Sequence, residues 1–169
     1  MIKKIYVVNG APASGKTTFE RMAQEELGES RCTIISIIDS IKEIAKLCGW
    51  NEQNKRPEDR KLLSDLKDAL DTWGNYSVNK LIQTINASDE DVIFVDCRSS
   101  YDIDKLKEYY TDEIKTIFIT AGERQKEQII LNHADADVLN YNYDYFIDNS
   151  GSYSDLRDTV QTFLEVENI

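Results

Sequence analysis

The sequence predicts an α/β fold in which a five-stranded parallel sheet lies between two layers of helices, a three-layer αβα sandwich. Five short runs of β-branched and aromatic residues recur along the chain, and stretches with helical spacing separate them. Strands that alternate with helices form parallel sheets that helices cover on both faces. The chain has 169 residues, two prolines and no low-complexity linker, so residues 1–169 suit a single domain.

Each expected strand is a short apolar run. The runs IKKIYVV, TIISII, DVIFVD, IKTIFIT and YDYFID place the strands at residues 2–8, 33–38, 91–96, 114–120 and 143–148. The stretches between them have helical spacing, as the positions of Phe19, Met22, Ala23 and Leu27 illustrate in the first. The expected helices cover residues 15–27, 40–48, 58–73, 77–87, 102–110, 122–139 and 153–166.

The chain leaves the first expected strand through GAPASGKTT, a stretch of small residues. Gly10, four further residues and then Gly15-Lys16-Thr17 fit the phosphate-binding pattern G-x-x-x-x-G-K-[ST]. Small residues let several backbone N–H groups converge on a phosphate, and the following helix adds the positive end of its dipole. Lys16 would reach the β- and γ-phosphates of ATP, and the Thr17 hydroxyl would hold Mg²⁺. The expected ATP-binding residues are Gly10, Ala11, Pro12, Ala13, Ser14, Gly15, Lys16, Thr17 and Thr18.

Polar residues follow the third expected strand at the edge where ligands of parallel sheets bind. Asp96 closes the strand, where a carboxylate holds Mg²⁺ directly or through water in phosphate-loop sites. A surface residue in a turn is the other interpretation of Asp96. Arg98 offers a guanidinium fork for a phosphate or carboxylate, or it forms a salt bridge with Asp102 or Asp104.

Asp39 follows the second expected strand, and Lys42 lies one turn into the next helix. In one interpretation Asp39 orients the attacking oxygen of an acceptor, or takes its proton if that oxygen is a hydroxyl. In the other it is a helix N-cap, with a competing capping box at Ser40 and Glu43. Lys42 is a candidate cation for binding the acceptor.

The net charge of −11 makes the chain a poor general binder of nucleic acid or of anionic membranes. Apolar runs such as VIFV are far too short to span a membrane, and the start of the chain lacks the apolar core of a signal peptide. The three cysteines have no metal-ligand spacing, which favours reduced thiols and a cytoplasmic protein. We expect a small-molecule partner and a monomer or homodimer, and we assign His133 no role.

Five segments resemble the nucleoside and nucleotide kinase branch of P-loop proteins. The match is closest to phage-type deoxynucleoside monophosphate kinases and to dephospho-CoA-kinase-like proteins. It covers most of the chain in the expected order. The segments are GAPASGKTT, IISIIDSIKEIAKLCGW, KRPEDRKLLSDLKD, DVIFVDCRSSYDIDKLKE and YNYDYFIDNSGSYSDL.

The resemblance implies a helical insert that binds the acceptor at residues 40–87 and a lid at residues 121–140. In the insert, Arg60 either reaches an acceptor phosphate or is a solvated charge. The lid offers Arg124, with Lys126 nearby, where such kinases often have several arginines. We expect the helix of the insert to bury its apolar residues, which are Leu62, Leu63, Leu66, Ala69, Leu70 and Trp73.

The favoured function is therefore ATP-dependent phosphoryl transfer to a nucleoside monophosphate or a related phosphorylated small molecule. Lys16, Arg124 and Mg²⁺ would stabilise the moving phosphoryl group, while Arg98, Lys42 and Arg60 would hold the acceptor. One alternative is a kinase of a hydroxyl on a nucleoside or cofactor precursor, with Asp39 as the base. Another is a nucleotide-binding regulatory protein with little turnover.

Overall fold

The structure is a computed structural model that describes residues 3–53, 56–122 and 140–169. The chain forms two compact units, of which the first comprises Met1–Ile34 with Asp89–Ile169. The second unit is Ile35–Ser88, a span that includes the predicted insert. Within the described residues no helix has the length and apolar character needed to cross a membrane.

The predicted sheet is confirmed. The strands are β1 (Lys4–Asn9), β2 (Cys32–Ser36), β3 (Val92–Asp96), β4 (Ile114–Thr120) and β5 (Tyr145–Asp148). Their order in the sheet is β2-β3-β1-β4-β5, and β1 pairs in parallel with both β3 and β4. Because the central strands are parallel, the carboxyl ends of β1, β3 and β4 lie at one edge of the sheet, where the first unit presents its loops.

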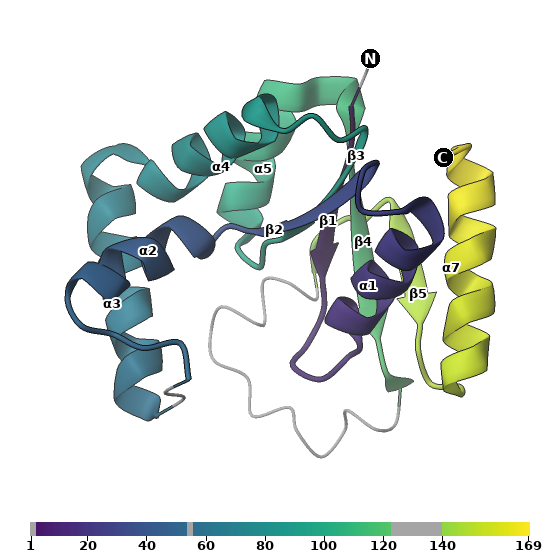
Figure 1. Cartoon of the computed structure of the whole chain (residues 1–169), viewed down its shortest axis with the longest axis horizontal. Coiled ribbons are helices and arrows are strands. Elements are labelled where there is room, and N and C mark those ends of the chain that lie inside the picture. The colour runs from purple at the N-terminus through teal and green to yellow at the C-terminus, as the bar shows by residue number, and fades with distance from the viewer. Residues whose placement is uncertain (1–2, 54–55, 123–139) are drawn as a thin grey trace. The chain divides into compact units, whose positions relative to one another are not determined.

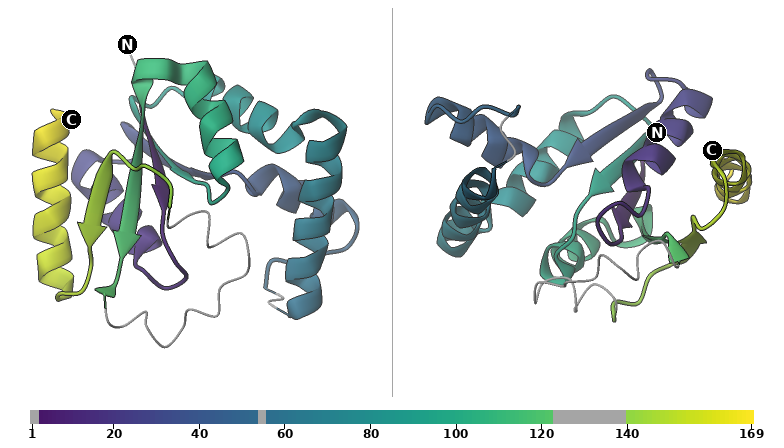
Figure 2. Two further views of the ribbon diagram at one scale, coloured as in Figure 1. Left: turned by 180° about the vertical axis from the view of Figure 1, so that it is seen from behind. Right: turned by 90° about the horizontal axis from the view of Figure 1, so that it is seen from below.

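Helices cover both faces of the sheet in the first unit. The described helices of this unit are α1 (Lys16–Leu27), α5 (Ser100–Tyr110) and α7 (Tyr153–Glu167), with a short 3₁₀ helix η1 (Thr111–Glu113) before β4. Figures 1 and 2 show α1 and α7 side by side on one face and α5 on the other. Side chains alternate along the strands, so Tyr6 and Phe94 join Phe19 of α1 and Phe163 of α7 in one apolar core. This packing fixes the position of α1, the helix that follows the glycine-rich stretch.

The described part of the second unit contains three helices, α2 (Asp39–Leu47), α3 (Pro57–Gly74) and α4 (Tyr76–Ala87). Ile41 of α2 and Leu81 and Ile85 of α4 are buried. The expectation that α3 buries its whole apolar stripe is wrong, because Trp73 is 83% exposed and Leu62 is 37% exposed. The stripe of this long helix is wider than the surface that its neighbours cover.

The predicted lid falls almost entirely outside the described residues. This includes Arg124, the lid residue expected to stabilise the transferring group, so its role stays a prediction. The structure describes residues 121, 122 and 140 of that segment.

Candidate phosphate-binding site

The glycine-rich loop between β1 and α1 has a sharply turned backbone. Gly10, Ala13 and Gly15 all have positive φ angles, of 146°, 60° and 98°. A Cβ atom on Gly10 would lie 2.2 Å from the carbonyl oxygen of Ile119, so this position accepts only glycine. Helix α1 starts at Lys16, directly after Gly15. The loop therefore curls at the N-terminus of a 12-residue helix, an arrangement that suits an anion.

The side chain of Lys16 lies against this loop. Its Nζ donates hydrogen bonds to the carbonyl oxygens of Gly10 at 2.8 Å and Ala11 at 3.0 Å, and the residue is 7% exposed. Thr17 is exposed in the first turn of α1. The structure thus places the ammonium group and the Thr17 residue at the same loop, as phosphate binding requires.

Asn149, which follows β5, also contacts the loop, and sequence analysis missed it. Its Nδ2 donates to the carbonyl oxygen of Ser14 at 2.9 Å, and its own N–H donates to the carbonyl of Thr120 at 2.6 Å. A Cβ atom on Gly15 would lie 2.2 Å from Asn149 Nδ2, so glycine is needed for this close approach. The available signal was a polar residue directly after an apolar strand, at the same edge of the sheet.

Asn9 connects the loop to the segment after β3. Its buried side chain accepts a hydrogen bond from the N–H of Gly10 at 2.7 Å and donates to the carbonyl oxygen of Arg98 at 3.3 Å. The backbone of Arg98 therefore lies beside the start of the loop. The Arg98 side chain is exposed and makes no ion pair with another described residue, so the predicted alternative, a salt bridge with Asp102 or Asp104, is absent from the described structure.

Asp96 is the last residue of β3 and lies level with Val8 of β1 in the sheet. This register puts the carboxylate two residues before Gly10 on the neighbouring strand. No cluster of three or more His, Cys, Asp or Glu residues suited to a metal occurs within the described ranges. Mg²⁺ commonly takes one or two protein ligands and completes its shell with water and substrate phosphates. Thr17 and Asp96 fit such a site.

Glu20, one turn after Lys16, is a buried carboxyl that sequence analysis did not identify. The residue is 3% exposed, and its Oε1 has no hydrogen-bond partner among the described residues. Burial and, second, the charge of Asp96 raise the pKa of Glu20 to about 8, although the Lys16 charge lowers it in part. The signal in the sequence was the spacing of Glu20 with Ala23 and Leu27 on the inner side of α1.

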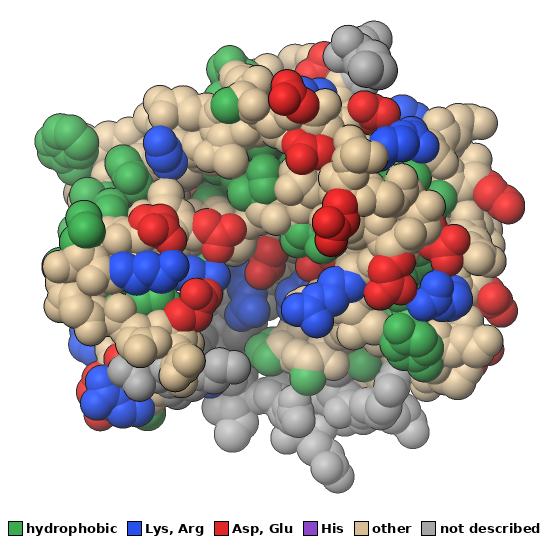
Figure 3. All heavy atoms as spheres, viewed as in Figure 1, with side chains coloured by type: hydrophobic (Ala, Val, Ile, Leu, Met, Phe, Trp, Pro, Cys, Tyr) green, Lys and Arg blue, Asp and Glu red, His purple; other side chains and the backbone are tan. Residues whose placement is uncertain are grey.

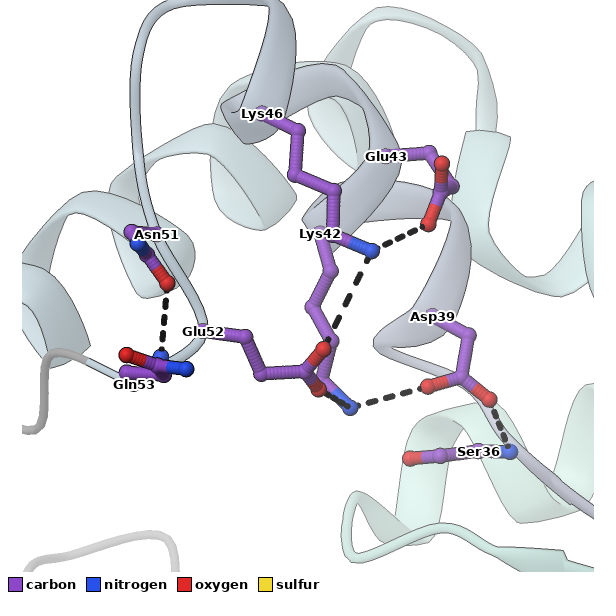
Figure 4. Close-up of polar contacts among 8 residues, drawn as sticks. All are labelled: Ser36, Asp39, Lys42, Glu43, Lys46, Asn51, Glu52 and Gln53. Carbon is purple, nitrogen blue, oxygen red and sulfur yellow. Dashed lines mark hydrogen bonds and ion pairs between the residues drawn. The ribbon is translucent and has the colours of Figure 1, made fainter.

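In the second unit, Asp39 is the first residue of α2 and not its N-cap. Its carboxylate accepts hydrogen bonds from the N–H of Ser36 at 2.8 Å and from Lys42 Nζ at 2.9 Å (Figure 4). The N-cap residue is Ile38, and no side chain caps this end of the helix. Both predicted capping interpretations, through Asp39 and through Ser40 with Glu43, are therefore wrong. The carboxylate instead fixes the strand-to-helix turn and pairs with the lysine.

Arg60 lies exposed in the first half of α3 and forms no ion pair with another described residue. The predicted site residues thus lie in both units: the loop residues with Asp96 and Arg98 in the first, and Asp39, Lys42 and Arg60 in the second. On the face seen in Figure 3, acidic and basic side chains are interspersed.

No family model matches the sequence, and no curated protein is significantly similar to it. Solved structures do share its fold. A shikimate kinase from Acinetobacter baumannii in complex with shikimate aligns over 98% of this chain and 93% of its own, with 14% identity and a TM-score of 0.52. An APS kinase from Mycobacterium tuberculosis aligns over 98% and 99%, with 14% identity and a TM-score of 0.51. A gluconokinase from Sinorhizobium meliloti aligns over 97% and 93%, with 15% identity and a TM-score of 0.51.

The chain therefore has the α/β fold of P-loop small-molecule kinases. At these identities the likeness concerns the fold alone. Its chemistry has to be argued from the loop and from the side chains around it.

Proposed function

We propose that the protein is an ATP-dependent kinase that transfers the γ-phosphoryl group of ATP to a small molecule. The observation that carries this proposal is the loop between β1 and α1. Its positive φ angles, the Lys16 ammonium on its carbonyl oxygens and the hydrogen bond from Asn149 support its role as a preorganised phosphate cradle.

Phosphoryl transfer depends mainly on positioning and on electrostatic stabilisation of the moving group. Lys16 would turn from the loop carbonyls to the β- and γ-phosphates and stabilise their charge. Thr17 and Asp96 would hold Mg²⁺, which when bound neutralises charge on the phosphate oxygens. Arg124 would add a further positive charge from the lid.

We propose a nucleoside monophosphate or a related phosphorylated small molecule as the acceptor, bound by Arg98, Lys42 and Arg60. The three solved structures described above are named as a shikimate kinase, an APS kinase and a gluconokinase, which supports a small-molecule acceptor. The exposed guanidinium of Arg98 supports an anionic group on it, because a guanidinium fork binds phosphate in a bidentate manner.

A second candidate is a kinase of a hydroxyl group, with Asp39 as the base. The orientation of Asp39 favours it, because one carboxylate oxygen binds the Ser36 N–H while the side chain remains 49% exposed. A carboxylate that is held in place but still accessible can orient a hydroxyl and accept its proton.

The decisive experiment is a screen of nucleosides, their monophosphates, dephospho-CoA, shikimate and gluconate, with ADP release as the readout. Mg-ATP at about 100 times its dissociation constant should stabilise the fold by roughly 2.7 kcal/mol. Lys16→Ala should remove most turnover while the protein remains folded. A melting temperature that saturating Mg-ATP leaves unchanged would refute the proposal.

Arg98→Lys tests the acceptor assignment, because lysine keeps the charge and loses the bidentate fork. We expect weaker acceptor use with little change in ATP affinity. Arg21→Lys, at an exposed position on α1, is the matched control. Equal losses for both substrates would show that Arg98 acts on ATP or on the fold.

A further inference from the structure

The chain reverses direction at the end of α2. Gly49 has a φ of 87°, and its N–H donates to the carbonyl of Lys46 at 3.0 Å. The N–H of Trp50 reaches back to the carbonyl of Ala45, also at 3.0 Å. This left-handed glycine cap turns the following segment, residues 50–53, back toward the helix. Glu52 thereby meets the lysines of α2.

The Glu52 carboxylate lies between the ammonium groups of Lys42 and Lys46, as Figure 4 shows. Its oxygens are 3.7 Å from Lys42 Nζ and 3.8 Å from Lys46 Nζ. Each lysine also has a shorter partner three residues earlier on its own helix, Asp39 at 2.9 Å and Glu43 at 2.8 Å. Glu52 is therefore the loosely held member of the cluster, and it is 59% exposed.

A broad, open surface depression of about 890 Å³ adjoins this carboxylate, and its lining residues are Lys46, Gly49, Trp50, Asn51, Glu52 and Gln53. It combines an ammonium group, two amide side chains and an indole. The Nε1 of Trp50 is buried and has no hydrogen-bond partner within the described part of the chain. Donors and a cation around a recess, with one carboxylate already between two lysines, are the features of an anion subsite.

We propose that Glu52 occupies an anion subsite formed by Lys42 and Lys46, and that a phosphate or carboxylate group of a small-molecule ligand displaces it. The Glu52 carboxylate, like a phosphate or carboxylate ligand, presents negatively charged oxygens to the two ammonium groups. Displacing Glu52 requires little free energy, because exposed ion pairs contribute little to stability. The identification of this ligand with the phosphoryl acceptor rests on the proposed function, whereas the subsite itself does not.

The test uses inorganic phosphate and acetate as probes and Trp50 as the reporter. Trp73→Phe leaves Trp50 as the single tryptophan, since the chain has two. In this background, phosphate at low ionic strength should change the Trp50 fluorescence. Glu52→Gln should tighten phosphate binding roughly two- to fivefold, the range expected for removing a competing exposed carboxylate. A response to acetate and not to phosphate would identify a carboxylate subsite.

The controls separate this subsite from other phosphate sites. Lys46→Met should weaken the change in Trp50 fluorescence that phosphate causes. Lys16→Ala, in the loop of the first unit, should preserve this change. Glu58→Gln changes the net charge equally at an exposed position of α3 and should leave the affinity unchanged. Equal affinities for the Glu52→Gln variant and its parent would overturn the proposal, as would a response that survives Lys46→Met.

The proposed function is tested independently through ADP release. If an acceptor is found and Glu52→Gln leaves its KM unchanged, the link between subsite and acceptor is wrong while the kinase proposal stands. If phosphate binds as expected and no acceptor supports turnover, the subsite stands and the kinase proposal fails.

Discussion

At alkaline pH the Glu20→Gln variant should be more stable than the wild type. In mild acid the two proteins should have nearly the same free energy of unfolding. Glu20 is 3% exposed, and burial with the Asp96 charge raises its pKa from 4.5 to about 8. Between these values the folded protein keeps the proton on Glu20, whereas the unfolded chain releases it. The free energy of unfolding therefore falls as the pH rises through this interval.

The magnitude follows from the two pKa values. Each pKa unit corresponds to about 1.4 kcal/mol, so the interval from 4.5 to about 8 corresponds to roughly 5 kcal/mol in full. Between about pH 5 and about pH 8 the expected loss is roughly 3 kcal/mol, because part of the interval lies outside this range. Glutamine has nearly the same shape as protonated glutamate and carries no charge at either pH, so the variant should avoid this loss.

The assay is urea unfolding of the nucleotide-free wild type and of Glu20→Gln at about pH 5 and about pH 8. The difference between the two proteins cancels most other titrating groups. Glu29→Gln, on the exposed turn after α1, serves as the control and should follow the wild type. If the free energy of unfolding changes equally with pH in the wild type and in Glu20→Gln, the argument is refuted, because Glu20 would then ionise normally in the folded protein.

Three further changes have definite expected results. Asn149→Ala removes the hydrogen bond to Ser14 and should weaken Mg-ATP binding about tenfold by calorimetry, the effect of roughly one hydrogen bond. Glu167→Gln leaves Lys115 without its charged partner and should lower the free energy of urea unfolding by roughly 1.5–3 kcal/mol. Burial opposes ionisation of Glu167, but bonds from Lys115 and from two tyrosines outweigh it and lower its pKa, so this difference should shrink as the pH falls below about 4.5. Asp39→Asn keeps an acceptor for the Ser36 N–H and loses the carboxylate, so turnover should fall roughly 10²–10⁴-fold in a folded protein.

The controls for these changes are exposed residues of the same type. Asn142→Ala should leave ATP affinity unchanged, and Glu165→Gln should leave stability unchanged. An Asn149→Ala protein with wild-type ATP affinity would show that the loop holds its shape without this support. A Glu167→Gln effect that is constant with pH, or wild-type turnover by Asp39→Asn, would contradict the corresponding assignment.

The sequence by itself determined the fold class, the boundaries of the described strands and helices to within a few residues, and the glycine-rich loop. The expected helix at residues 122–139 lies almost entirely outside the described residues. The features that the sequence determined are local. The start of α1 at Lys16 and the apolar runs of the strands depend on residues that are neighbours in the chain, and glycine at positions 10 and 15 permits the positive φ angles of the loop. Short-range sterics and side-chain periodicity are sufficient to predict them.

Only the tertiary structure decided which side chains meet around the loop. Asn149 and Ser14 are 135 residues apart, so no spacing in the sequence relates them. Glu20 has the spacing of an inner residue, but its raised pKa depends on burial by other segments and, second, on the charge of Asp96 at the end of β3. The capping interpretations of Asp39 were wrong because its carboxylate accepts hydrogen bonds from the Ser36 N–H, before the helix, and from Lys42 within the helix. A polar group can form hydrogen bonds or ion pairs with several kinds of partner. The packing of segments that are distant in the sequence determines which of these partners lies close enough.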